Sequence, residues 1–581
     1  MSDRTIYLFM WGYQDTYRIQ IRSLVRNVLK ELGAPPEAEV LLVGARSPDS
    51  TNPNPVCVEP EGGQWPLKLF DGLLESIEST YRDHDLQTMF YSDAPSMRDK
   101  PEWIRRDSVR TSAQEALKVF DSEHDVTSFC GEVRRIGDYH VTPIVQIPNA
   151  TFRLFPPLPS KPIENRRQGY GFRSLIHAAV SAVLREATEE LNNPEPGRFT
   201  RRGIRNAEEV VRIAAKDFLH TPGLSIEQQY YHTDLFDSLN LVSSLMYEGA
   251  KGVGHLILAA PNNESIEFLA QFSEPVSFRE PRWVRKVLQM ATLGVGVIAD
   301  SRHIYGLGQL SYSHDHSAQD AFTVAFIDHY LWELRYKDQV LLRSHYAVPT
   351  LPQEPFDKAD FLANYARLFP LSSPADALHL WNLLITQISQ DHGSMIVVAE
   401  DAASEAQRLS KQGTSIVPTR LTEALLRSFS GIDGTILLDP LGICYAIGII
   451  LDGEATEQCT PSRGSRYNSG VRYVRAQFHR RLAIVVSDDR TTDIIPQIRR
   501  LVSRKLLENH IAGLEAATLD NYHDHRNWLN DHRFYVNSEQ CARINKTVER
   551  LDALPKEVGL IYLGTERYEK HPDMEESYLT D

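Results

Sequence analysis

The segment GIDGTILLDPLGICYAIGIILDG spans residues 431–453, and the segment HRRLAIVVSDDR spans residues 479–490. Each contains a short apolar run, at 435–438 and at 482–486, of the kind that forms a buried β-strand. A helical pattern precedes the first run, and another follows the second. We therefore predict an α/β domain over residues 371–507, with the two runs as strands of its sheet.

Acidic residues stand at the outer ends of both predicted strands. Asp433 comes just before the first run, and Asp488 and Asp489 come just after the second. Residues 462–470 lie between the runs and are rich in Gly, Ser, Arg and Asn, which indicates a polar loop. Carboxylates bind hard divalent cations, and such a loop offers backbone N–H groups and a guanidinium to phosphate oxygens. The pattern is typical of a metal-bound triphosphate site, although Asp-Gly alone is more often a plain turn.

The order of these motifs resembles that of a known family. Asp-Gly-Thr, then Gly-Ser-Arg-Tyr-Asn, then Val-Val-Ser-Asp-Asp is similar to the Asp-Gly-Ala, Gly-Thr-Arg-His-Arg and Val-Ser-Glu-Glu series of the diadenylate cyclase family, in particular the nucleotide-binding domain of the DNA-integrity scanning proteins. The resemblance covers roughly residues 371–506. Tyr467 and Asn468 depart from the family's His and second Arg, so half of the phosphate clamp is altered while the carboxylates remain.

The resemblance implies a role for each matching residue. Asp433 would position or deprotonate an attacking 3′-hydroxyl, with a bound Mg²⁺ or Mn²⁺ lowering the pKa of that hydroxyl. The metal ligands implied are Asp433, Asp488 and Asp489. The nucleotide-binding residues implied are Gly434, Thr435, Arg463, Gly464, Ser465, Arg466, Asn468 and Ser487. Candidates to replace the missing guanidinium are Arg463, Arg472 and Arg475.

The same resemblance implies a metal-dependent nucleotidyltransferase of the diadenylate-cyclase type, which joins two nucleoside triphosphates into a cyclic or linear dinucleotide signal. ATP is the expected substrate, and the altered loop leaves another NTP or a dNTP open. Bacterial stress or antiphage signalling is the setting by analogy. A second hypothesis is a non-catalytic sensor that binds a nucleotide or dinucleotide in this domain and regulates a partner. A third is a structural α/β protein with a residual motif.

An earlier part of the chain repeats the pattern of this domain. GHLILAAPNNE at 254–264 aligns with 393–403, and PRWVRKVLQMATLGVGVIADSRHIYGLG at 281–308 aligns with 418–448. The pairs at an offset of roughly 139 residues are Gly254 with Gly393, Asp300 with Asp439 and Ile304 with Ile443. The later Asp433-Gly434 is Gly294-Val295 in the earlier copy. We hypothesise a tandem duplication with a degenerate first copy; chance similarity of two α/β units is the alternative.

The predicted fold class is therefore α/β. It consists of a mixed-sheet, diadenylate-cyclase-like domain in tandem with a degenerate copy, preceded by an N-terminal α/β domain in which we recognise no chemical motif. The expected domains are 1–150 (N-terminal α/β domain), 151–230 (connecting helical region), 231–350 (degenerate copy), 371–507 (nucleotide-binding domain) and 508–581 (C-terminal extension with a disordered tail).

Composition limits the functional classes. The chain of 581 residues carries a formal charge of −15, which argues against general nucleic-acid binding. Its five cysteines lie far apart without a C-x-x-C pair, which indicates neither a zinc ribbon nor a disulfide framework. The His-Asp-His runs at 314–316 and 523–525 are interpreted as exposed turns. No apolar run reaches the roughly 18–20 residues of a membrane span. We expect a soluble cytoplasmic protein that forms a homo-oligomer or an intrachain pseudo-dimer and acts on a protein effector.

Overall fold

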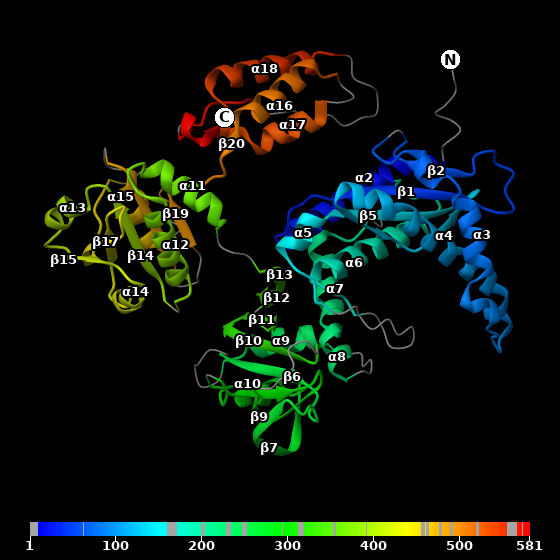
Figure 1. Ribbon diagram of the computed structural model, residues 1–581, viewed down its shortest axis with the longest axis horizontal. Coiled ribbons are helices and arrows are strands. Elements are labelled where there is room, and N and C mark those ends of the chain that lie inside the picture. The colour runs from blue at the N-terminus through cyan, green and yellow to red at the C-terminus, as the bar shows by residue number, and fades with distance from the viewer. Residues whose placement is uncertain are drawn as a thin grey trace. The chain divides into compact units, whose positions relative to one another are not determined.

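The structure is a computed structural model. It divides into an N-terminal unit, Met1–Gln353, and a C-terminal unit, Glu354–Asp581, each of which is α/β. Figure 1 shows the elements of both. The residues that the structure describes are 10–61, 63–159, 171–198, 204–227, 234–246, 253–292, 294–311, 319–337, 339–352, 356–390, 392–454, 459, 464–475, 479–487, 492–518, 522–554, 566–571 and 573–581.

An antiparallel sheet opens the N-terminal unit, with the strand order β2-β1-β5-β3 and with β4 paired to β5. Its central strands β1 and β5 are runs rich in Val, Leu and Ile and are buried along almost their whole length, as expected for strands covered on both faces. The strands are β1 (Glu39–Arg46), β2 (Val56–Glu59), β3 (Val126–Cys130), β4 (Arg134–Ile136) and β5 (Tyr139–Pro148).

One face of this sheet shares an apolar core with α2 (Gln14–Glu31), α6 (Leu175–Glu190) and α7 (Ala207–Phe218). Apolar residues of α2 recur every three or four positions, which places Tyr17 and Ile21 on one buried stripe. The helices predicted as a connecting region therefore pack on the sheet of the first 150 residues.

The opposite face of the sheet is covered by α3 (Leu73–Arg82) and α4 (Ala94–His124), which lie side by side (Figure 1). Their apolar residues, including Ile77 and Leu117, share a core with β1 and β5. Short helices in the connections are η1 (Leu67–Phe70), η2 (Asp85–Thr88) and α5 (Asn149–Leu154).

A second sheet follows in the same unit, with the order β13-β12-β11-β10-β6-β8-β9-β7. It is mixed, because β6 and β8 run parallel while their outer neighbours are antiparallel. The helices α8 (His220–Glu227), α9 (Leu235–Ser244) and α10 (Pro281–Leu288) contribute to the core on one face. The strands are β6 (Gly254–Ala259), β7 (Ile266–Ser277), β8 (Gly296–Ala299), β9 (His303–Leu310), β10 (Ala321–Asp328), β11 (Leu331–Tyr336), β12 (Gln339–His345) and β13 (Val348–Thr350).

The C-terminal unit contains another mixed sheet, with the order β15-β17-β16-β14-β18-β19 and the parallel pair β14 and β16. Apolar cores lie on both of its faces. One includes residues of α11 (Lys358–Leu368), α12 (Pro374–Ile388) and α14 (Glu423–Phe429), and the other includes residues of α13 (Ala402–Arg408) and α15 (Ser465–Arg475). The strands are β14 (Ser394–Ala399), β15 (Thr414–Arg420), β16 (Thr435–Leu438), β17 (Ile443–Ile449), β18 (Arg481–Val486) and β19 (Thr492–Ile495).

The last part of the C-terminal unit is helical and has its own core. Its elements are α16 (Arg504–Ala516), α17 (Tyr522–Asp531), η3 (Arg533–Tyr535), α18 (Ser538–Asp552), η4 (Glu576–Tyr578) and the parallel strands β20 (Val502–Ser503) and β21 (Leu579–Thr580). The exposed turn predicted at 523–525 is wrong: these residues lie within α17, and His525 is half-buried with its Nδ1 3.3 Å from that of His510.

The mixed sheets of the two units repeat one topology. The order β7-β9-β8-β6-β10-β11 matches β15-β17-β16-β14-β18-β19, with the parallel pair at the same place. The register corrects two predicted pairs by one residue. Ala299 faces Ile304 as Leu438 faces Cys444, so Ile304 corresponds to Cys444, because Gly442 lengthens the later turn. Gly254 likewise begins β6 as Ser394, not Gly393, begins β14.

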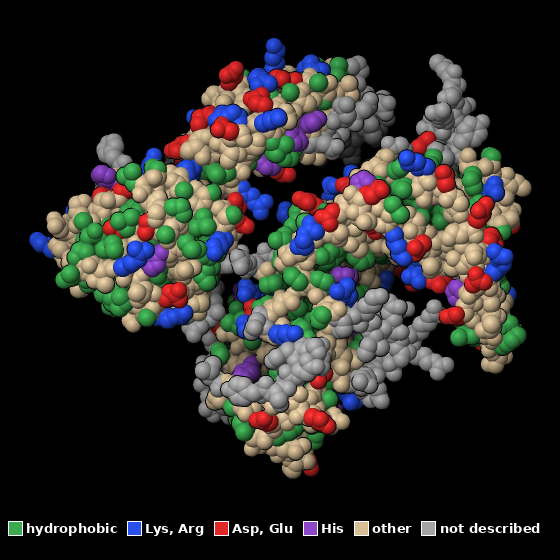
Figure 2. Space-filling view, viewed as in Figure 1, with side chains coloured by type: hydrophobic (Ala, Val, Ile, Leu, Met, Phe, Trp, Pro, Cys, Tyr) green, Lys and Arg blue, Asp and Glu red, His purple; other side chains and the backbone are tan. Residues whose placement is uncertain are grey.

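Two surface properties bear on function. Among the described helices, none has the length and apolar character needed to cross a membrane. On the face that Figure 2 shows, Lys and Arg side chains are interspersed with Asp and Glu and do not gather into one basic patch.

Candidate functional site

Asp433, the predicted catalytic residue, lies in the turn before β16, and its side chain is 96% exposed. Its Oδ1 accepts the backbone N–H of Gly434 at 3.1 Å. Gly434 has φ 114°, and an added Cβ would lie 2.5 Å from the backbone of Gly448 on β17. A tight turn against a neighbouring strand therefore accounts for the Asp-Gly pair. The next residue, Thr435, is fully buried in the sheet and not accessible to a ligand in this structure.

The residues predicted as a phosphate-binding loop begin a helix instead. Ser465, Arg466 and Asn468 lie in the first turn of α15, and Gly464 precedes it. The loop prediction is thus wrong for the described residues from Ser465 onward. Arg466 Nη2 lies 3.6 Å from Asp433 Oδ1. The side-chain amide of Asn468 donates to the carbonyl of Gly464 at 3.3 Å.

The structure thus brings Arg466 close to Asp433, so a guanidinium faces the carboxylate that was expected to bind a metal. Ser487 follows β18 and is half-buried. The described part of the chain holds no group of three or more His, Cys, Asp or Glu side chains that could bind a metal ion. The Mg²⁺ or Mn²⁺ site stays a prediction, because two of its ligands, Asp488 and Asp489, lie outside the described part of the chain. Arg463 of the predicted nucleotide-binding set and the His-Asp-His run at 314–316 lie outside it too.

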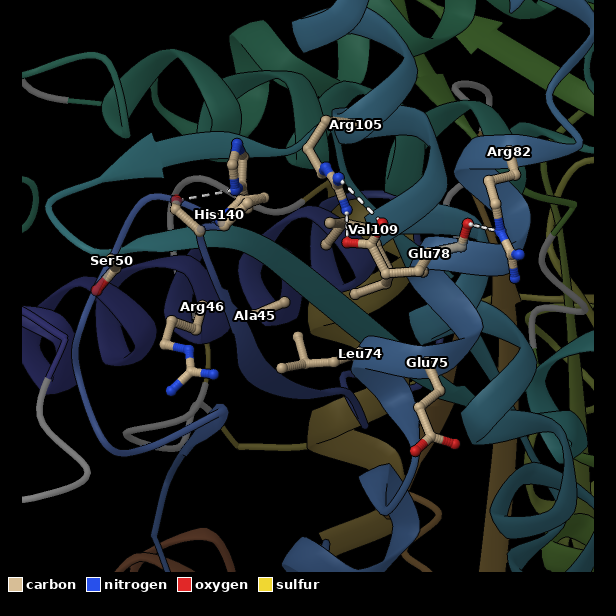
Figure 3. Close-up of a pocket in the computed structure, with 13 residues that line it drawn as sticks. Ala45, Arg46, Ser50, Leu74, Glu75, Glu78, Arg82, Arg105, Val109 and His140 are labelled. Atoms are coloured by element: carbon tan, nitrogen blue, oxygen red, sulfur yellow. Dashed lines mark hydrogen bonds and ion pairs between the residues drawn. The ribbon is translucent and has the colours of Figure 1, made fainter.

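A cavity of about 470 Å³ lies in the N-terminal unit, between one end of its antiparallel sheet and the helices α3 and α4 (Figure 3). The register pairs Ala45 with His140 and Arg46 with Tyr139. Arg46 at the end of β1 and His140 at the start of β5 therefore meet at the same end of the sheet, and α4 adds Arg105. The volume is typical of a small-molecule site.

Charged side chains of both signs line this cavity, with guanidiniums in excess: Arg46, Arg82 and Arg105 against Glu75 and Glu78. Arg105 donates to both carboxylate oxygens of Glu78, at 2.6 and 3.4 Å, and its guanidinium lies 4.5 Å from the ring centre of Tyr81. Arg46 donates to the backbone carbonyl of Asn52. Figure 3 shows Arg46 and Arg105 among the side chains that line the cavity.

His140 joins the sheet to α4. Its Nδ1 lies 3.1 Å from Ser47 Oγ, and its Nε2 lies 3.3 Å from Glu102 Oε2. Burial lowers the pKa of His140, and the Glu102 carboxylate opposes part of this shift. The imidazole is therefore mainly neutral at neutral pH, and a neutral ring has one donor and one acceptor nitrogen.

Sequence reasoning missed this cavity, because its polar residues come from separate segments and form no local motif. The available signal was the antiparallel pairing of β1 with β5, which places Arg46 and His140 at the same end of the sheet. The alternation of basic and acidic residues along α3 and α4 is common to any exposed helix face. It could not single out Arg105 or Glu78.

Comparison with protein families gives two matches. Residues 10–219 match a family described as "Probable sensor domain DACNG", and residues 233–338 match one described as "Probable sensor domain DACNH". The first range contains every residue that lines the cavity. No curated protein matches the chain.

Solved structures give partial similarities. DacA from Staphylococcus aureus, in a double-mutant form, covers 23% of this chain and 91% of its own at 16% identity, with a TM-score of 0.18. A hypothetical membrane spanning protein from Bacillus cereus covers 22% of this chain and 62% of its own at 23% identity, with a TM-score of 0.19. TM-scores this low support no inference.

The family matches overturn the predicted recognition. The families found are those of probable sensor domains and not the diadenylate cyclases, and neither matched range includes residues 371–507. The nucleotidyltransferase assignment is wrong on the same finding, and the matches give no support to magnesium-dependent activity or antiviral defence. The turn at Asp433 and the helix at Ser465 give the physical reason why the motif misled. Over two tandem ranges, the chain is similar to probable sensor domains.

Proposed function

We propose that the chain is a small-molecule sensor and that the cavity between β1, β5, α3 and α4 is its ligand site. One observation carries this proposal: Arg46, Arg105 and His140, from three different elements, converge on one cavity of about 470 Å³ within residues 10–219. Convergent polar groups in a cavity of this size are typical of binding sites. This location replaces the nucleotide-sensing site predicted over residues 371–507.

The lining favours a small polar ligand with an acidic group. Three guanidiniums against two carboxylates leave the lining net positive, and Arg105 is already paired with Glu78. We assign the ligand's carboxylate or phosphate to Arg46, at the end of β1, through a charge-assisted hydrogen bond, because Arg82 is bound to the Glu78 carbonyl at an exposed position on α3. Leu74, Ile77 and Val109 provide apolar surface for the rest of the ligand. Nucleotides, amino acids and organic acids are the ligand classes to test.

The same cavity offers a route from binding to regulation. Its walls are strands on one side and α3 and α4 on the other, so a ligand that contacts both favours the arrangement in which they are close. The hydrogen bonds from Ser47 through His140 to Glu102 already link the sheet to α4. We propose that a partner protein, or a second copy of the chain, responds to this close arrangement of the sheet with α3 and α4.

The test is ligand binding by the full chain. Thermal unfolding is followed with each nucleotide, amino acid and organic acid, and the affinity of each stabilising compound is measured by calorimetry. A ligand at about 100 times its Kd stabilises the folded state by about 2.7 kcal/mol. We expect Arg46→Gln to weaken binding at least about tenfold, because it removes a charge-assisted bond.

The matched control is Arg98→Gln. Arg98 is on α4, is well exposed, and does not line the cavity. The proposal would be contradicted if Arg46→Gln left ligand binding unchanged, or if no compound shifted the unfolding temperature.

A further inference from the structure

A second cavity, of about 450 Å³, lies on the mixed sheet of the N-terminal unit. Its polar lining is basic or neutral, and none of its described lining residues is acidic. This distinguishes it from the first cavity, where guanidiniums and carboxylates are mixed. The polar lining residues are His255 on β6, Gln309 on β9, Thr323 on β10, Arg335 on β11 and Lys337 just after β11.

The cavity occupies the face of the sheet that a helix fills in the other unit. In the C-terminal unit, Val471 and Tyr473 of α15 pack on this face with Met395 and Ala483. In the N-terminal unit the described apolar cluster on this face consists of strand residues: Ile257, Ala259, Ile298 and Ala321, with Ile266, Phe268 and Leu310 packed around them.

The matching positions carry different side chains in the two units. By the strand pairing, His255 corresponds to Met395 and Thr323 to Ala483. Among the described residues, polar side chains thus line the cavity at positions where the C-terminal unit has core residues packed against α15. His255 is held closely: a Cβ on Gly296 would lie 2.8 Å from its ring.

Arg335 is held in place by a buried carboxylate. Glu333 is 1% exposed and accepts two hydrogen bonds from Arg335, at 2.6 and 3.0 Å, and two from Arg343, at 2.6 and 2.8 Å. Two guanidiniums share one carboxylate, so the group carries a net positive charge. Such fixed donors lose little conformational entropy on binding an anion.

Lys337 adds a second cation at the same end of the cavity. It has φ 54° in the turn after β11, and its Nζ lies 5.1 Å from the ring centre of Tyr336. The positive φ restricts which residues suit this position, and the aromatic ring gives the ammonium a favourable cation–π contact.

We propose that this cavity is a second ligand site, which binds the phosphate group of a phosphorylated small molecule. Arg335 and Lys337 contact the phosphate oxygens, the Arg335 guanidinium as a fork and the Lys337 ammonium as a point charge. The organic part lies over Ile257, with His255 and Thr323 as hydrogen-bonding groups. The site does not rest on the proposed function of the first cavity, because it shares no residue with it.

The test is equilibrium dialysis of the full chain against radiolabelled pyrophosphate and ADP, with adenosine as the uncharged comparison. We expect pyrophosphate and ADP to bind and to compete with each other, and we expect their binding to weaken as salt is raised. Arg335→Gln and Lys337→Asn are each expected to weaken ADP binding at least about tenfold. Asn is chosen at 337 because it tolerates positive φ.

Arg343→Gln is the matched control. It removes the other partner of Glu333, and with it one positive charge, but no group that lines the cavity, so binding should weaken much less than in Arg335→Gln, by no more than about threefold. Gly296→Ala removes no charge and places a methyl group against His255, and it is expected to weaken ADP binding more than pyrophosphate binding. Arg46→Gln, in the first cavity, should leave dialysis results at this site unchanged.

Four results would overturn the proposal: no binding of either phosphate compound, adenosine binding as tightly as ADP, an equal loss in Arg343→Gln and Arg335→Gln, or loss of all binding in Arg46→Gln alone. The third result would show that Glu333, Arg335 and Arg343 have only a structural role. Loss of all binding in Arg46→Gln alone would place the phosphate site in the first cavity.

Discussion

Asp300 and Asp439 hold the same place in the two mixed sheets, one residue beyond the second strand of each parallel pair. The hydroxyl of Tyr305 donates to Asp300 at 2.6 Å, and that of Tyr445 donates to Asp439 at 3.2 Å. Each carboxylate also accepts two backbone N–H groups of the turn that follows it. The two aspartates therefore align in the sequence because each of them stabilises the turn that follows its strand.

Replacing these aspartates should destabilise each unit separately. Asp300 is 3% exposed and its bonds are short, so Asp300→Ala leaves three donors without their acceptor and should cost about 2–3 kcal/mol. Asp439 is half-buried with longer bonds, so Asp439→Ala should cost about 1 kcal/mol. Denaturant-dependent hydrogen exchange, read by mass spectrometry on peptides of β9 and β17, reports the two units separately. An equal effect of both substitutions would contradict the ranking by burial.

Strands with short apolar runs could be predicted from the sequence. The run at 435–438 is β16, and the run at 482–486 is β18 apart from its first residue. Both are fully buried, so hydrophobicity alone marks them. The shared order of strands and turns in residues 254–308 and 393–448 could also be predicted from the sequence. The predicted alignment was wrong by one residue after Asp439, because Gly442, with φ 77°, makes the later turn one residue longer.

The helix α15 could not be predicted from local composition. Gly464, Asn468 and Gly470 make the segment resemble a loop. Its helical structure follows from packing, because Val471 and Tyr473 are buried against the sheet. A Cβ on Gly470 would meet side chains of β18 and β19 at 3.3–3.4 Å, so glycine allows the helix to approach closely. Tertiary packing thus outweighs helix propensity here.

The cavities depend on still longer-range information. Arg46 and His140 lie at the same end of the sheet through the register of β1 with β5, and no spacing within the sequence encodes that placement. The burial of Glu333 between Arg335 and Arg343 likewise depends on the pairing of β11 with β12, which no local sequence pattern predicts. Motif reasoning instead favoured Asp433, whose neighbours in sequence formed the more familiar pattern.

Arg481 should be a major source of stability in the C-terminal unit. It is buried, pairs with Asp401 at 2.7 Å and with Glu405 at 3.1 Å, and its guanidinium lies 4.1 Å from the ring centre of Tyr473. Arg481→Leu leaves two largely buried carboxylates without this partner and should cost about 3–5 kcal/mol. Hydrogen exchange of β14 and β18 measures the loss.

Arg408 provides the control for that experiment. It also pairs with Glu405, at 2.7 Å, but its side chain is 40% exposed. Arg408→Gln should therefore cost less than about 1 kcal/mol. Equal losses in the two variants would mean that burial does not set the strength of these pairs.

Asp433→Asn tests the site that the sequence first suggested. Asp433 is exposed and lies 3.6 Å from Arg466, an arrangement that contributes little to stability. We expect no measurable change in the unfolding temperature of the C-terminal unit and no change in the ligand response governed by Arg46. Loss of that response in Asp433→Asn, with the fold intact by circular dichroism, would return a functional role to the turn before β16.

His177 should make the N-terminal unit sensitive to acid. It lies on α6, near the rings of Phe129 and Phe152. Burial, with a smaller contribution from Arg173, lowers the pKa of His177 to about 4. The unfolded chain keeps the ordinary histidine pKa of about 6.5. Above that value neither state binds the proton, and stability is complete. As the pH falls from about 6.5 to about 4, only the unfolded state is protonated, so about 3 kcal/mol is lost, with no further loss from this group below about 4.

His177→Gln removes this titration and should flatten the dependence of the unfolding free energy on pH between about 4 and 6.5. Denaturant unfolding at a series of pH values, monitored by hydrogen exchange of β5 and α6, gives the comparison with the original chain. The exposed His479 of the C-terminal unit offers a control, and His479→Gln should leave the N-terminal profile unchanged. Carboxylates also titrate in this range, but they are common to all the proteins compared, so the difference between the profiles isolates His177. A profile that His177→Gln leaves equally steep would show that this imidazole is protonated in the folded state or accessible to water.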